Sequence, residues 1–141
     1  MIADTADQVS TIRIARYDEG DAIHQLCLAG GMWEINGLDW SRISGWIVAE
    51  DEQGLIGCIQ VCVACPISRV ELLFVHPRAS HREKAILCRD LVAAAFAVAK
   101  MGGASAVHTT IPDHFPDEWR KIIIRRDAVE WYHGISYLRK V

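Results

Sequence analysis

The stretch from Val70 to Ile111 constrains the fold of this chain more than any other. An apolar segment ends at His76-Pro77, a second apolar segment runs from Lys84 to Lys100, and a segment rich in Val and Thr follows two glycines. This order predicts a strand, a tight loop, a buried helix and another strand. Such a loop brings backbone N–H groups and a helix N-terminus to one point, which favours anion binding.

The start of the long helix has a signature of its own. Ser80 and Glu83 have the spacing of a capping box, in which the two residues satisfy each other's backbone N–H groups. The helix is therefore expected to begin after Ser80. From Lys84 to Lys100 it is apolar on most sides, which predicts that it is buried on most of its surface.

The rest of the chain predicts further strands and helices around this unit. Strands are expected over 11–16, 46–50, 55–64, 70–75 and 104–111, helices over 22–29, 81–100 and 116–127, and a final strand or strand pair over 128–141. This order predicts a mixed α/β domain with helices packed on a single sheet. We expect one domain over 11–141, with a loose polar lead over 1–10.

Composition excludes several classes of function. The net charge of −3 gives no reason to expect a nucleic acid or an anionic membrane as a partner. The polar N-terminus does not read as a signal peptide, so a cytoplasmic protein with reduced thiols is expected.

Cys62 and Cys65 form one Cys-x-x-Cys pair, but a zinc site needs about four ligands and no second pair exists, so no metal is expected. The simpler interpretation is that Cys58 and Cys62 share a strand face as small apolar residues.

Three motifs together resemble the GNAT superfamily, the acyl-CoA-dependent N-acetyltransferases. The segments 46–51 and 54–58 resemble the central hairpin of that family, and Leu73-Phe-Val-His-Pro resembles the end of its fourth strand. Residues 82–87 stand where the family has Arg/Gln-x-x-Gly-x-Gly/Ala. The resemblance covers about 12–141. It implies an α+β GNAT fold: a central mixed, mostly antiparallel sheet with splayed fourth and fifth strands, flanked by helices.

The resemblance implies acetyl-CoA as co-substrate. The pantetheine arm is expected between the splayed strands, against the backbone of Phe74 and Val75. The diphosphate is expected on the loop and helix start, at Arg82, Glu83, Lys84, Ala85, Ile86 and Leu87. The reaction is direct attack of an amine on the thioester, for which the protein positions the reactants and removes a proton.

This phosphate loop departs from the family pattern at two positions. Leu87 stands where a small residue lets phosphates approach, and Glu83 puts a carboxylate where glycine is common. The cations expected to oppose Glu83 and Asp90 are Arg78, Arg82, Lys84 and Arg89. Two geometries remain open for Leu87. If its side chain points between the strands, the site is closed, and if it packs under the helix, the site is open.

Candidate catalytic and substrate residues follow from the same resemblance. Glu71 lies on the strand where family members often place a general base, and the simpler interpretation is a strand residue that faces solvent or pairs with Arg69. His114, in the loop after the following strand, is a candidate acid, or simply a loop histidine. Trp33 and Glu34 lie where the family has its variable substrate loop.

The usual acid of the family, a tyrosine, is missing here between Trp119 and Arg126. Besides His114, nearby substitutes are His108, Tyr132 and Tyr137. Many family members are dimeric, so a homodimer is an expectation that no motif of this chain fixes.

Two hypotheses of function follow. The first is an N-acetyltransferase that acts on an amine of a small molecule or a protein. The second is a GNAT-fold protein without turnover that serves as a binding or structural component, as in some phage proteins that short chains of this kind resemble. The geometry around Leu87 distinguishes them.

Overall fold

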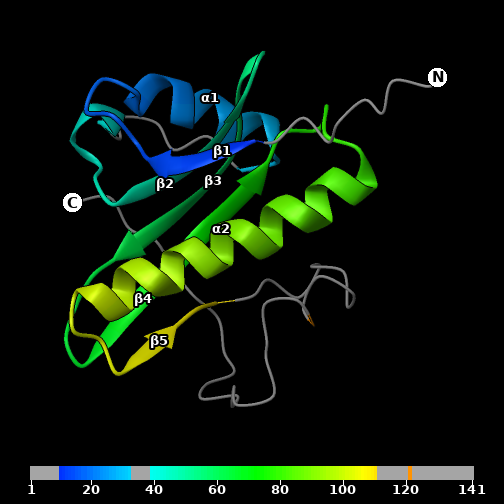
Figure 1. Cartoon of the computed structure of the whole chain (residues 1–141). Helices are drawn as coiled ribbons and strands as arrows, with labels where there is room; N and C mark the ends of the chain where they lie inside the picture. Colours follow the sequence, from blue (N-terminus) through cyan, green and yellow to red (C-terminus); the bar gives the residue numbers. More distant parts are fainter. Residues whose placement is uncertain (1–9, 33–38, 111–120, 122–141) are drawn as a thin grey trace.

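The computed structural model of this chain describes residues 10–32, 39–110 and 121 (Figure 1). The expected N-terminal lead, Trp33, Glu34, His114 and nearly all of the helix and strands expected after residue 110 lie outside the described residues. The elements are β1 (Thr11–Ile14), α1 (Gly20–Ala29), the 3-10 helix η1 (Trp40–Arg42), β2 (Trp46–Asp51), β3 (Gly54–Cys62), β4 (Ile67–Val75), α2 (His81–Met101) and β5 (Ala106–His108).

The strands form one sheet in the order β1-β2-β3-β4-β5. The first four strands pair antiparallel, and β5 runs parallel to β4 after the crossover through α2. Figure 1 shows the long helix α2 lying along one face of the sheet and the shorter α1 on the other side. The predicted α+β class and the mixed, mostly antiparallel sheet are confirmed.

Each face of the sheet carries its own apolar core. The core under α2 joins Leu87, Leu91 and Ala95 to inward-facing residues of β2, β3 and β4. The core under α1 is smaller, and it includes Trp40 and Trp46. Burying side chains on both faces explains why β2 has four successive buried residues and no clean alternation.

Several boundaries differ from the prediction. β4 begins at Ile67, three residues earlier than predicted, and β3 ends at Cys62 rather than at Ala64. The reason is the fully buried Ser68, whose hydroxyl accepts the N–H of Ala64 at 3.0 Å and donates to its carbonyl at 2.9 Å. These bonds close the turn, so pairing resumes at once with Cys62 opposite Arg69.

The middle of β4 carries a bulge that the sequence pattern did not predict. Gln60 pairs with Glu71 and Cys58 pairs with Phe74, so two residues of β4 oppose Ile59 alone. Leu72, the first of these two, has φ 56°, a left-handed conformation that is unfavourable for a residue with a branched side chain. No glycine stands at the position, so no local pattern predicts the bulge.

Candidate functional site

The parallel contact between β4 and β5 is short. It joins Ile67–Arg69 to Ala106–His108, with Arg69 opposite His108 as the last pair. Beyond Arg69, β4 continues to Val75 without a further paired residue of β5 in the part of the chain described, and the bulge at Leu72 lies at this point. The described residues therefore fit the predicted opening between the fourth and fifth strands, which begins beyond this pair.

The backbone of β4 turns hydrogen-bonding groups toward this opening. His76 donates its N–H to the carbonyl of Ile56 in β3 at 2.8 Å. Because successive residues of a strand point their backbone groups to opposite sides, the N–H and C=O of Val75 face away from β3. Val75 thus offers a donor and an acceptor to an extended chain in the opening. Phe74 instead faces α1, where its side chain packs against Gly30.

The β4–α2 loop is closed by its own hydrogen bonds. His76 Nδ1 accepts the N–H of Arg78 at 3.0 Å, and the His76 carbonyl accepts the N–H of Ala79 at 3.1 Å. Ser80 Oγ accepts the N–H of Glu83 at 3.2 Å, and Glu83 Oε2 accepts the N–H of Ser80 at 2.8 Å. The predicted capping box is confirmed, and it already satisfies two amides at the helix start.

Leu87 does not point into the opening. Its side chain is only 4% exposed and belongs to the core between α2 and the sheet. Of the two geometries left open by the sequence, the structure has the one in which the side chain packs under the helix. Ala85 and Ile86 also lie inside α2, where amide N–H groups bond to carbonyls four residues earlier. An anion at this helix end would therefore meet the amides of the first turn.

Two of the four basic residues counted around the β4–α2 loop are paired with carboxylates other than Glu83. Arg78 forms a two-pronged ion pair with Asp51 at 2.5 and 2.8 Å, and this pair holds the pKa of Asp51 below its usual value. Arg89 pairs with Asp90 at 2.8 Å. Arg82 and Lys84 make no ion pair with the described residues, so they are the cations left to face Glu83.

Glu71 lies one residue before the bulge, on the α1 face of the sheet. Its carboxylate accepts a hydrogen bond from Arg69 Nη2 at 2.6 Å, and the side chain is 30% exposed. The pairing with Arg69 that the sequence allowed is therefore present. Gln60 stands directly across from Glu71 on β3, and His108 stands across from Arg69 on β5. The structure thus gathers Glu71 and His108 at the mouth of the opening.

Some features of the site had no signal in the sequence. The Arg78–Asp51 pair joins residues that are 27 positions apart. The stacking of His24 on Trp40, with ring centroids 4.5 Å apart, is likewise a tertiary contact. Trp40 is buried in the core under α1.

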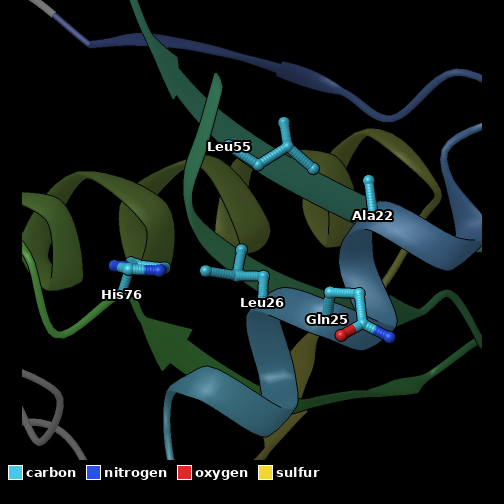
Figure 2. Close-up of a pocket in the computed structure, with 5 residues that line it drawn as sticks. All are labelled: Ala22, Gln25, Leu26, Leu55 and His76. Carbon is cyan, nitrogen blue, oxygen red and sulfur yellow. The ribbon is translucent and has the colours of Figure 1, made fainter. Parts of the chain in front are cut away.

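A pocket of about 270 Å³ lies on the α1 side of the sheet (Figure 2). Its walls are Ala22, Gln25 and Leu26 of α1, Leu55 of β3, and His76 just after β4. It lies at the end of the sheet where β4 enters the α2 loop, five positions along the chain from Glu71.

The cysteines are free thiols in the structure. Cys58 is buried as expected, but Cys62 is exposed, so the prediction that both act as buried apolar residues is right only for Cys58. Among the described residues, no three His, Cys, Asp or Glu side chains come together in a way that could hold a metal ion. Within those same residues, no helix is both long and apolar enough to cross a membrane.

Several solved structures with a similar fold are acetyltransferases. A ribosomal-protein-alanine N-acetyltransferase from Brucella melitensis aligns with TM-score 0.67 and 16% identity over 92% of this chain and 99% of that chain. An aminoglycoside acetyltransferase from an uncultured soil metagenomic sample, solved with sisomicin, aligns with TM-score 0.63 and 14% identity over 92% and 99%.

A Mycobacterium tuberculosis protein solved with CoA aligns with TM-score 0.55 and 18% identity over 70% of this chain, which spans 63% of its length. The sequence matches no protein-family model and no curated protein. With these structural matches, the strand order and the opening of β4 from β5 define the class: the chain has the fold of the GNAT acetyltransferases.

Proposed function

We propose that this chain is an acyl-CoA-dependent N-acetyltransferase that moves an acetyl group from acetyl-CoA to an amine. The observation that carries the proposal is the burial of Leu87 beside the opening of β4. The side chain of Leu87, which could have filled the space expected for the phosphates, packs in the core instead. The alignment with solved acetyltransferases at TM-scores up to 0.67 supports the same function.

The residues fit acetyl-CoA as follows. Val75 offers its backbone donor and acceptor to the amides of the pantetheine arm. The first turn of α2 offers the positive end of a helix of 21 residues to the diphosphate, with Arg82 and Lys84 beside it. When bound, acetyl-CoA supplies an activated thioester.

Glu71 is the candidate general base. An amine arrives as an ammonium ion and must lose a proton before its nitrogen can attack the thioester carbon. The nitrogen–carbon bond then forms and the carbon–sulfur bond breaks. The nitrogen loses its second proton, which passes through water or an acid side chain to the departing thiolate, so the amide and the CoA thiol are the products. Glu71, next to the bulge, accepts the ammonium proton directly or through water. His108, across from Arg69, is the described residue best placed to protonate the thiolate, and His114 is the other candidate.

The acceptor is proposed to be an amine of a small molecule or of a protein. The names of the similar structures include one enzyme for each kind, an aminoglycoside acetyltransferase and a ribosomal-protein-alanine N-acetyltransferase. A substrate loop at Trp33 and Glu34, a cytoplasmic location and a homodimer are parts of this proposal that rest on the sequence alone.

A second candidate function is a GNAT-fold binding or structural component without turnover. The capping box favours it, because Glu83 holds the Ser80 amide and places a carboxylate where the diphosphate should sit. The Arg78–Asp51 pair also favours it, because it removes one cation from the loop.

Release of free thiol from acetyl-CoA tests the proposal, with a panel of amines that includes aminoglycosides and N-terminal alanine peptides. Glu71→Gln should lower kcat on any accepted amine by about 10²–10⁴-fold and leave the affinity for acetyl-CoA unchanged. Glu52→Gln, in the exposed β2–β3 turn, is the matched control and should keep full activity. Binding of acetyl-CoA without turnover of any amine would favour the second candidate.

A further inference from the structure

The pocket beside α1 has a mostly apolar lining with two polar groups. Figure 2 shows His76 beside Leu26 at one end of the pocket and Ala22 with Gln25 at the other. Leu26 is buried, Leu55 and His76 are half-buried, and Ala22 and Gln25 are exposed, so the pocket has a packed floor and an open rim. A volume of about 270 Å³ is near the lower limit of small-molecule sites.

The hydrogen bond of His76 to the loop fixes what its ring can offer. Nδ1 accepts the N–H of Arg78, so Nδ1 carries no proton, and the ring proton is on Nε2. Nε2 makes no hydrogen bond with the described residues. His76 therefore presents an N–H donor at the pocket, and the Gln25 amide at the rim adds further donors.

These features select a ligand by charge as well as by shape. Asp21, next to Ala22 in the first turn of α1, opposes an anion at the rim. An ammonium ion has no acceptor to offer Nε2. A neutral carbonyl oxygen on a short apolar body meets every requirement, since the body covers Ala22, Leu26 and Leu55.

We propose that this pocket is a binding site for a small neutral molecule that carries an amide or ketone carbonyl, with the oxygen accepting the Nε2–H of His76. Its occupant is coupled to the phosphate loop, because the same imidazole holds the Arg78 amide through Nδ1. Arg78 in turn binds Asp51 and lies 3.4 Å from the Leu55 carbonyl. This site does not depend on the proposed acetyl transfer.

The test is an NMR titration of the full chain without CoA, observing histidine ring nitrogens, leucine methyls and backbone amides. The probe is N-propylacetamide, and propylammonium and butyrate are the matched cation and anion. We expect saturable shifts of His76 Nε2, the Leu26 and Leu55 methyls and the Arg78 amide with the amide probe only. A ligand of this size is expected to have a Kd on the order of 1–10 mM.

Three variants sharpen the result. Ala22→Phe should fill the pocket and abolish the shifts, while Ala97→Phe, on the exposed side of α2, should leave them unchanged. His76→Asn keeps an acceptor near the position of Nδ1 and removes the Nε2–H, so it should weaken binding about three- to tenfold with the fold intact. Equal shifts with all three probes, shifts that do not saturate, or full binding by Ala22→Phe would overturn the proposal.

Discussion

Ser80 and Glu83 form two reciprocal hydrogen bonds at the first turn of α2. The Ser80 hydroxyl accepts the backbone N–H of Glu83, and the Glu83 carboxylate accepts the backbone N–H of Ser80 at 2.8 Å. The helix end at which we propose that the diphosphate binds is thus partly occupied by the chain's own side chain. Helix stability and anion binding therefore compete for the same groups in this protein.

Glu83→Gln separates these two roles. Glutamine keeps the capping hydrogen bond and removes the negative charge, so stability should change little while the affinity for acetyl-CoA rises about three- to tenfold at low salt. Titration calorimetry at two salt concentrations measures this. Asp90→Asn, which removes a charge already paired with Arg89, is the control and should have little effect. An unchanged affinity for Glu83→Gln would place the diphosphate elsewhere.

Leu87→Ala tests whether this side chain supports the core or blocks the site. Because Leu87 is buried under α2, the change should cost about 2–5 kcal/mol of unfolding free energy and leave acetyl-CoA affinity within about twofold. Ile86→Ala, at a half-buried neighbour, should cost less. Urea unfolding gives the free energy of unfolding, and titration calorimetry gives the affinity for acetyl-CoA. A gain in affinity without loss of stability would show that Leu87 lies in the approach to the phosphates.

The chain's local patterns predicted much of this fold, and its long-range contacts account for most of what they missed. The capping box at Ser80 and the hairpin around Asp51–Gly54 depend on residues a few positions apart, and both were predicted. The start of β4 was missed for a different reason: the hydroxyl of the buried Ser68 closes the preceding turn on Ala64, four positions earlier, a side-chain bond that the strand pattern does not show.

The site was predicted less completely than the fold, again because of long-range contacts. A count of basic residues overstated the positive charge of the β4–α2 loop. Arg78 is neutralised by Asp51, which lies 27 positions away in the chain. The bulge at Leu72 could not be predicted, because no glycine stands at the position with positive φ. The geometry of Leu87 required the packing of α2 on the sheet, which no local pattern contains.

Substitutions at Leu72 should reveal the strain of the bulge. The left-handed backbone costs a branched residue about 1–2 kcal/mol, which Gly would relieve, with an entropic cost of about 0.5–1 kcal/mol in return. Leu72→Gly should therefore leave stability unchanged or raise it by up to about 1.5 kcal/mol, while Leu72→Ile should lose about 1–2 kcal/mol. Urea midpoints compare the two variants. The reverse order would mean that Leu72 has ordinary strand geometry in solution.

The Arg13–Glu19 pair predicts an acid-sensitive contribution to stability. Arg13 donates to both oxygens of Glu19 at 2.6 and 2.8 Å, which lowers the pKa of Glu19 from 4.5 to about 2. A lowered folded-state pKa means that the stabilisation is complete above about pH 4.5 and disappears as the pH falls toward 2.

Glu19→Gln should accordingly be less stable than the wild type at pH 6, and the difference should vanish near pH 2. Urea unfolding between pH 2 and pH 6 measures it. A difference that does not depend on pH would mean that the Glu19 carboxylate gains nothing from Arg13.

The most direct test of the central claim is the melting temperature of the chain with and without acetyl-CoA, with ADP as the control anion. At about 100 times its Kd, a ligand adds about 2.7 kcal/mol, a rise of about 6–10 °C for a domain of this size. We predict such a rise with acetyl-CoA and a much smaller one with ADP. No rise at millimolar acetyl-CoA, in both the wild type and Glu83→Gln, would contradict the acetyltransferase proposal.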